Sequence, residues 1–308
     1  GKDVLIDFLC NNLALIKDIS GNDDLLLSSY DNLVKIKKDK SKLQNGVELL
    51  VNSPQFGAAF ESRFELISGK EKGKALKNLT ELALSGILYY ISQVLNHLVD
   101  NDHFKKGVSK SLKICLGGKA STLYKIVFED SDEQEGLSKM IEKVTGGIFS
   151  SISIEFTNTP KHEVSYGLLV DQTGATDLNI KERSHETILG EDVLVGKTNI
   201  GIVSKLNVDS EWRIKDISQL KNFLKLLQAY SKIPVKLTKK FEGDLEGKIN
   251  AELRNGQARA LENAKNQQSI EGDDSIAELQ KTSTIVEPVF IQGLKEIIHN
   301  ITNGKIKL

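Results

Sequence analysis

The sequence predicts an α+β protein in which a helical half precedes a strand-rich half. Before the Gly146-Gly147 pair, apolar residues recur mostly at the three- and four-residue spacing of amphipathic helices. After it, the segment 151–156 (Ser-Ile-Ser-Ile-Glu-Phe) alternates polar and apolar residues, as a half-buried strand does. We therefore predict a mainly helical domain at 1–145 and an antiparallel β-sheet domain with C-terminal helices at 146–308.

Composition indicates an ordinary globular protein. Of the 308 residues, 39% are hydrophobic and 27% are charged, which is enough to bury a core without disulfides or metals. Cys10 and Cys115 lie far apart and neither belongs to a C-x-x-C pair, so neither a disulfide framework nor a cysteine zinc site is supported. Polar residues interrupt the apolar segment 4–16, which therefore does not resemble a secretory signal. We expect a cytoplasmic protein with free thiols.

One run, Leu79 to Val99, approaches the length that a membrane span needs. Glu81 lies near its start, and Gln93 and Asn96 lie near its end, so the uninterrupted apolar part is much shorter than a bilayer. We predict a central helix that is buried on most sides, and no membrane span.

The helical half contains clear start and stop signals. Ser53 can cap a helix that begins at Pro54 and ends at Gly69. Ser131 and Gln134 have the spacing of a capping box. The other helices are expected at 4–18, 24–44, 74–99, 103–114 and 132–145, and one strand at 122–128.

The second half is predicted to contain strands about ten residues apart, a spacing typical of antiparallel connections. These strands are expected at 148–157, 163–171, 177–183, 186–195, 198–208 and around 212–214. A continuous apolar stripe predicts a helix near 216–231 that packs against the sheet. The polar stretch 243–278 predicts a surface helix that frays into a loop, and the apolar patch 285–301 predicts a C-terminal segment docked on the core.

The net charge of -1 conceals a basic region. Residues 35–125 hold sixteen Lys and Arg against eight Asp and Glu, and 105–125 holds six lysines and no acid. Such a face could bind nucleic acid non-specifically through phosphates, with these candidate residues: Lys105, Lys106, Lys110, Lys113 and Lys119. Lysines on a solvated helix face explain the same pattern, since Arg63 is the one arginine of this region.

No complete catalytic motif is present, but one segment offers an enzymatic alternative. Residues 168–175 (Leu-Leu-Val-Asp-Gln-Thr-Gly-Ala) form an apolar strand that ends in Asp-x-Thr-Gly. This segment resembles the nucleophile motif of the haloacid-dehalogenase and P-type ATPase families. The resemblance implies that Asp171 would accept a phosphoryl group with the help of Mg²⁺. A hairpin turn at Thr173-Gly174 accounts for the same residues.

Two weaker patterns point in the same direction. Acidic residues and one histidine gather downstream of the first motif and could bind a divalent metal, with these candidate ligands: Asp171, Asp177, His185 and Glu186. The polar outer face of an antiparallel sheet explains this cluster equally well. Glu246-Gly247-Lys248 resembles the tail of a restriction-type nuclease motif, and a polar entry into a helix also accounts for it.

The sequence therefore favours a non-enzymatic binding or scaffold protein without a cofactor. We expect it to be a subunit of a larger assembly with a protein partner. For the basic region at residues 35–125 two interpretations stay open: non-specific binding of nucleic acid, and an ordinary solvated lysine face. The alternative is a metal-dependent phosphoryl-transfer or nuclease enzyme centred on Asp171.

Overall fold

The computed structural model describes residues 2–100, 110–116, 131–156, 212–231, 233, 235, 237–271 and 288–306, together with short strands between 187 and 204. Over these residues the protein is mostly helical. The helices are α1 (Lys2–Asn11), α2 (Leu13–Ser20), α3 (Asp24–Ile36), α4 (Lys40–Asn52), α5 (Pro54–Ser68), α6 (Glu71–Asp100), α8 (Ser131–Val144), α10 (Ser218–Tyr230), α11 (Lys239–Glu271) and α13 (Val289–Thr302). The strands are β1 (Lys110–Leu116), β2 (Phe149–Phe156), β3 (Thr187–Ile188), β4 (Val193–Val195), β5 (Thr198–Ile200), β6 (Val203–Ser204) and β7 (Trp212–Ile214).

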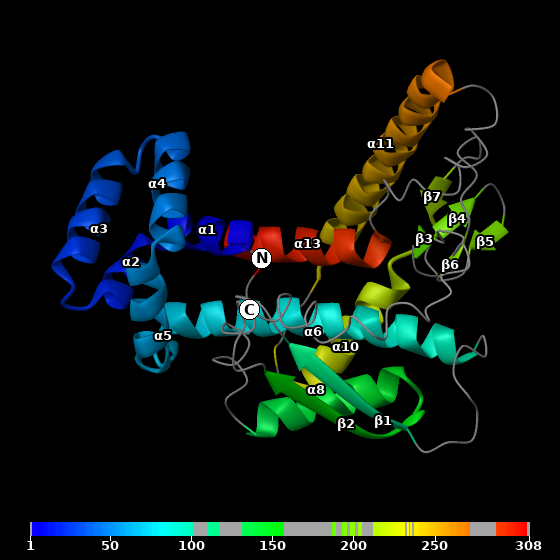
Figure 1. Ribbon diagram of the computed structural model, residues 1–308, viewed down its shortest axis with the longest axis horizontal. Helices are drawn as coiled ribbons and strands as arrows, with labels where there is room; N and C mark the ends of the chain where they lie inside the picture. The colour runs from blue at the N-terminus through cyan, green and yellow to red at the C-terminus, as the bar shows by residue number, and fades with distance from the viewer. Residues whose placement is uncertain are drawn as a thin grey trace.

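The long helix α6 organises the molecule (Figure 1). Helices α1 to α5 form a lobe at one of its ends, α13 runs beside it, and α8, β1 and β2 lie on its other side. Helix α11 extends away from this body. The α+β class therefore holds in a coarse sense, because small sheets accompany a mainly helical architecture.

The N-terminal lobe contains more helices, and shorter ones, than the sequence predicts. The expected helix at 4–18 is two helices separated at Asn12, and the one at 24–44 is two helices separated at 37–39. The predicted helix after Ser53 is confirmed: Ser53 Oγ accepts a hydrogen bond from the Phe56 N–H at 3.2 Å, and Pro54 occupies the first turn.

Helix α6 confirms the central helix predicted at 74–99. Between 81 and 92 this helix is buried on most sides, including at the polar Glu81 and Ser85, whereas Ile87 and Ile91 are exposed. Within the described part of the chain, no helix combines the length and the apolar character that crossing a bilayer requires.

Strands β1 and β2 form a parallel pair, and this corrects two predictions. The described end of the helix expected at 103–114 is a strand, because Leu112, Ile114 and Leu116 alternate with polar neighbours. Strand β2 agrees with the strand expected at 148–157, but the antiparallel pairing expected for it is wrong, because it pairs in parallel with β1. The chain passes through α8 between the two strands, and such a crossover is the connection that parallel pairing needs.

The Gly146-Gly147 pair ends α8, as its place at the change of period suggests. Both glycines have positive φ angles, 63° and 73°, a conformation that costs glycine little. The Gly147 N–H donates to the Glu142 carbonyl at 3.0 Å, which satisfies one of the last carbonyls of the helix.

The C-terminal half is not built on the antiparallel sheet that was predicted. Its antiparallel pairs, β3 with β6 and β4 with both β5 and β7, are built from strands of only two or three residues. The predicted helix at 216–231 is confirmed as α10, but α10 packs against α6, α8 and α13. Strand β7 lies on α11, where Asn250 Oδ1 accepts the Ile214 N–H at 2.8 Å. The strands predicted at 122–128, 163–171 and 177–183 lie outside the described residues.

Helix α13 docks the C-terminal segment on the core, as predicted. Ten of its fourteen residues are buried. Phe290 packs against Tyr89 and Tyr90 of α6 and against Phe223 of α10, with ring centroids 5.1 to 6.1 Å apart. Asn11 Nδ2 donates to the Thr302 carbonyl at 3.1 Å, which links α13 to the first helix.

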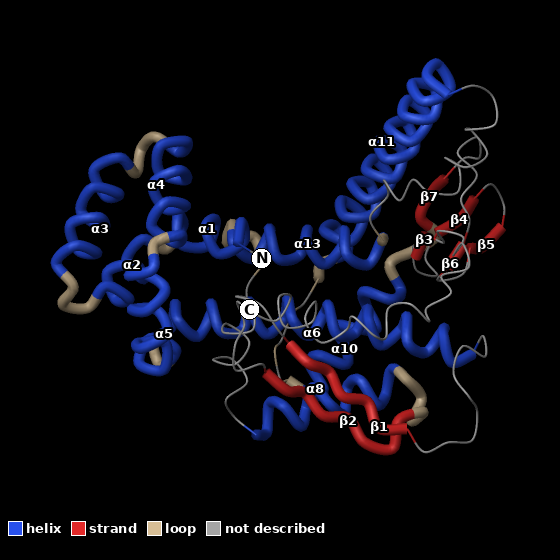
Figure 2. Tube along the Cα trace, in the orientation of Figure 1, coloured by secondary structure: helices blue, strands red, loops and turns tan. Residues whose placement is uncertain are grey.

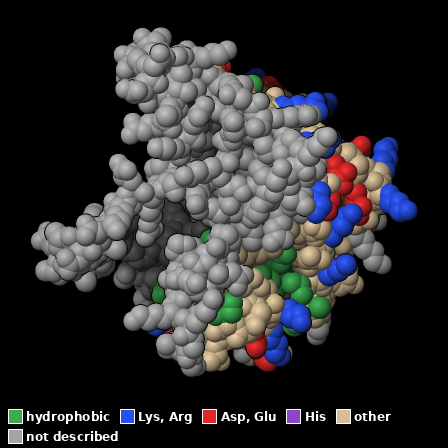
Figure 3. Space-filling model, turned by 90° about the vertical axis from the view of Figure 1, so that its right-hand side faces the viewer, with side chains coloured by type: hydrophobic (Ala, Val, Ile, Leu, Met, Phe, Trp, Pro, Cys, Tyr) green, Lys and Arg blue, Asp and Glu red, His purple; other side chains and the backbone are tan. Residues whose placement is uncertain are grey.

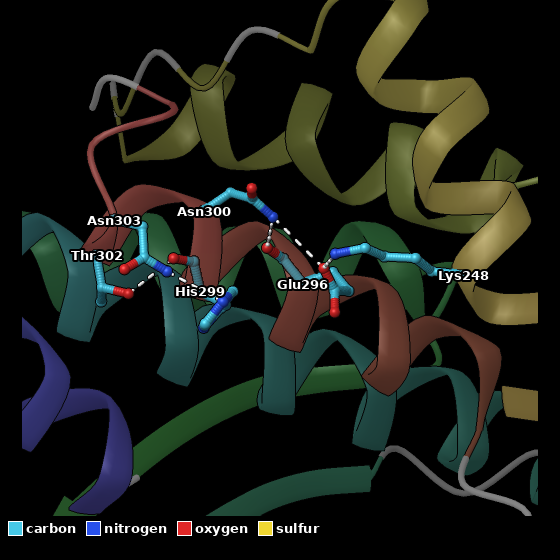
Figure 4. Close-up of polar contacts among 6 residues, drawn as sticks. All are labelled: Lys248, Glu296, His299, Asn300, Thr302 and Asn303. Carbon is cyan, nitrogen blue, oxygen red and sulfur yellow. Dashed lines mark hydrogen bonds and ion pairs between the residues drawn. The ribbon is translucent and has the colours of Figure 1, made fainter. Parts of the chain in front are cut away.

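Polar side chains of α13 contact α11 and one another (Figure 4). Lys248 Nζ of α11 lies 2.6 Å from Glu296 Oε2, and Asn300 Nδ2 donates to the Glu296 carbonyl at 2.7 Å. Near the end of the helix, Asn303 Nδ2 lies 3.0 Å from His299 Nε2. Nearly all buried apolar residues of the two halves belong to a single hydrophobic cluster.

Candidate nucleic-acid interface

Two of the five candidate lysines lie within the described residues, and both belong to a strand whose partner strand carries a glutamate. Lys113 belongs to β1, and its Nζ is 2.7 Å from Glu155 Oε2 on β2. The hydrogen bond that Lys113 donates to this glutamate raises the pKa of Lys113 above its usual value. Lys110 is the first residue of β1. Three other predicted binding residues lie outside the described residues: Lys105, Lys106 and Lys119.

The second group of predicted site residues consists of the candidate catalytic and metal-binding residues. Asp171, Asp177, His185 and Glu186 lie outside the described residues. Within the described ranges, no three His, Cys, Asp or Glu side chains come together as metal ligands would. Lys248, from the nuclease-like Glu-Gly-Lys triplet, pairs with Glu296 and joins α11 to α13.

A different lysine cluster stands out in the structure, where α3 ends and α4 begins. We call it the lysine turn, and it consists of five exposed residues: Lys35, Lys37, Lys38, Lys40 and Lys42. Between 35 and 42 the single acidic residue is Asp39. Figure 2 shows this short connection at the end of the lobe opposite α5. The positive charges therefore gather on a projecting part of the molecule.

Asp39 explains why the chain turns at this point. Its backbone is extended, and its Oδ1 accepts the Lys42 N–H at 3.1 Å, so Asp39 is the N-cap of α4. Asp39 Oδ2 also lies 3.3 Å from Lys42 Nζ. The one carboxylate of the turn is thus engaged by Lys42. No ion pair among the described residues involves Lys35, Lys37, Lys38 or Lys40.

Tight packing beneath the turn holds it in place. A Cβ atom at Gly46 of α4 would lie 2.7 Å from Leu33 Cδ2 of α3, so the two helices approach closely just behind the lysines. Leu33, Leu43 and Val47 are buried there, and α1 packs on α4 from the other side. Consequently, the lysine side chains extend from a well-packed helix pair.

Several other cations of the helical half are used within the fold. Lys70 Nζ lies 2.6 Å from Asp18 Oδ1, and Arg63 Nε donates to the Asp18 carbonyl at 3.2 Å. Farther along the chain, Lys139 pairs with Glu135 at 2.6 Å. On the face shown in Figure 3, the described basic and acidic side chains are interspersed. The lysine turn differs because its lysines outnumber the nearby acids.

The sequence prediction missed this cluster for a specific reason. The lysine turn lies within the basic region 35–125, but a continuous helix at 24–44 would distribute its lysines around the helix axis. Asp39 was the available signal, since aspartate is a preferred N-cap residue. Comparison with protein-family models, with curated proteins and with solved structures finds no match for this chain.

Proposed function

We propose that this chain is a non-enzymatic cytoplasmic binding protein whose helical half contacts nucleic acid, and that it acts as a subunit of a larger assembly. The observation that carries the proposal is the lysine turn. Four of its lysines have no ion-pair partner among the described residues, and one carboxylate lies between them.

The chemistry of the surface favours a phosphate partner. Lysine ammonium groups act as point charges, and they attract phosphate oxygens without selecting a base. Binding releases the counterions that surround the nucleic acid, so the affinity falls steeply as salt is added. The expected activity is thus non-specific binding that depends on ionic strength.

Fluorescence anisotropy tests this function directly. A short labelled duplex is titrated with the parent protein at about 50 mM and about 200 mM salt. We expect binding at the lower salt concentration, with similar affinity for two unrelated sequences, and much weaker binding at the higher one. Absence of any anisotropy change at low salt would remove nucleic acid from the proposal.

A further inference from the structure

We propose that the lysine turn is a docking surface for the phosphate backbone of double-helical nucleic acid, which it prefers to single strands. This inference rests on the proposed function and adds to it the location of the surface and the form of the partner. Three observations on the described residues support it: the number of unpaired lysines, the packing beneath them and the lack of an exposed aromatic side chain for stacking.

The number of lysines determines the salt dependence. Lys35, Lys37, Lys38 and Lys40 can each contact a phosphate, whereas Lys42 contacts Asp39. For B-form DNA, each neutralised phosphate contributes about -0.9 to the slope of log K against log salt. Four contacts therefore predict a slope of about -3 to -4.

The packing of the turn favours a duplex. The four lysines lie within six consecutive residues that join two closely packed helices, so their charges are concentrated at one place. A duplex carries one phosphate charge for about every 1.7 Å of its axis, twice the density of one strand alone. A compact cluster of cations therefore has more phosphates within reach on a duplex than on a single strand.

Proteins that prefer single strands usually stack the bases on exposed aromatic side chains. In the described part of the chain, the large hydrophobic residues that are exposed are leucines and isoleucines: Leu25, Leu49, Leu66, Ile87 and Ile91. Tyr30, the aromatic residue of α3, is partly buried against the core. A single strand would therefore gain no stacking energy here to compensate for its lower charge density.

The test compares the parent with two variants of equal net charge. The first carries Lys35→Glu, Lys37→Glu, Lys38→Glu and Lys40→Glu. The control carries the same change at four exposed lysines elsewhere: Lys143, Lys215, Lys225 and Lys239. Anisotropy is measured on a DNA duplex and on each of its separate strands over a salt series. Circular dichroism checks that both variants are folded, and a milder Lys→Gln set replaces any variant that is not.

We expect the parent to bind the duplex at least about tenfold more tightly than either strand, with the slope given above. The lysine-turn variant should lose at least about tenfold in duplex affinity and most of the slope, whereas the control should retain the slope. Equal losses in the two variants would overturn the location while leaving the proposed function in place. Equal or tighter binding of single strands would overturn the duplex preference. No binding by the parent would remove both proposals.

Discussion

Two helical glycines lie in opposite environments. Gly136 of α8 is buried, and a Cβ atom there would lie 2.7 Å from the carbonyl oxygen of Tyr230, at the end of α10. Gly247 of α11 is exposed, and a Cβ atom there would meet nothing within 4 Å. The same substitution should therefore have opposite effects at the two positions.

We expect Gly136→Ala to lower the free energy of unfolding by about 1–3 kcal/mol, because the backbone of Tyr230 must move. Gly247→Ala should raise it by about 0.5–1 kcal/mol, since alanine is the better helix former. Urea denaturation of the three proteins measures both changes. If Gly136→Ala were as stable as the parent, the close contact between α8 and α10 would be wrong.

We expect the phenol of Tyr90 to make the stability of the protein depend on pH in the alkaline range. Its ring stacks on Phe290, and burial raises the pKa of its phenol to about 12. In the unfolded chain this pKa is about 10. Between these values the unfolded state loses the proton and the folded state keeps it, so stability falls as the pH rises. Below this range the contribution of Tyr90 is fully present.

The corresponding variant is Tyr90→Phe, which cannot ionise. Denaturant unfolding at about pH 9 and about pH 11 should show a smaller loss of stability for the variant than for the parent. Comparing the two proteins removes the contribution of the other groups that titrate in this range. A parallel decline in both would show that Tyr90 is not buried in this way.

Substitution of Asp171 tests whether the chain is a binding protein or the alternative metal-dependent enzyme. For a turn residue, Asp171→Asn should cost no more than about 1 kcal/mol, the value of a local hydrogen bond. We expect no Mg²⁺-dependent change in the melting temperature of the parent and no hydrolysis of a generic phosphoester. A Mg²⁺ shift in the parent that Asp171→Asn abolishes would favour the enzyme instead.

At the scale of elements, the end of α3 and the start of α4 depend on one cap. Asp39 stabilises α4 through its hydrogen bond to the Lys42 N–H, and its negative charge reduces the positive potential of the lysine turn. The capping role of Asp39 and the effect of its charge can be tested separately, because asparagine is also a good N-cap residue but carries no charge.

We expect Asp39→Ala to lower the free energy of unfolding by about 1 kcal/mol, and Asp39→Asn to change it by much less. Both variants should bind duplex DNA more tightly than the parent at low salt, because each removes a carboxylate from the surface. Thermal unfolding and anisotropy provide the two measurements. Unchanged duplex affinity in both variants would contradict the role of the lysine turn.

Elements with strong local signals could be predicted from the sequence. Helix α5 has its cap at Ser53 and a proline in its first turn, and α10 has one uninterrupted apolar stripe. The breaks at Asn12 and Asp39 were missed because the helical period continues across a short interruption. Polar residues at such positions are also common on exposed helix faces.

The sheets were harder to predict for a different reason. Alternation of polar and apolar residues identifies a strand such as β2, but it contains no information about the partner strand or its direction. In β1 the same alternation was present over 111–116, but it was assigned to the end of a helix. The lysine turn was not predicted for a related reason. The number of charges can be counted in a sequence, but where the charged side chains lie in space depends on where the helices end.

At the scale of the whole molecule, the two sequence halves share buried surface. Helix α13 packs on α1 and α6, and α10 packs on α8. We therefore expect limited proteolysis to cut first in the polar stretch between Asn263 and Ser275. We do not expect cleavage at 146–148 to release two stable fragments, because the α8 end of this junction is packed in the core. Two surviving fragments from an early cut there, seen by mass spectrometry, would show independent domains.

The position of α13 also has a consequence for how the chain acquires its structure. Helix α13 is synthesised after every element that it contacts, yet it supplies Phe290, Leu294 and Ile297 to the middle of the core. Until it emerges from the ribosome, the surfaces of α1, α6 and α10 that it covers remain open to water. The contacts that close the core therefore join residues nearly 300 positions apart, as in the hydrogen bond between Asn11 and Thr302. Such distant contacts slow folding, and until α13 docks, the apolar surfaces that it covers are open to aggregation.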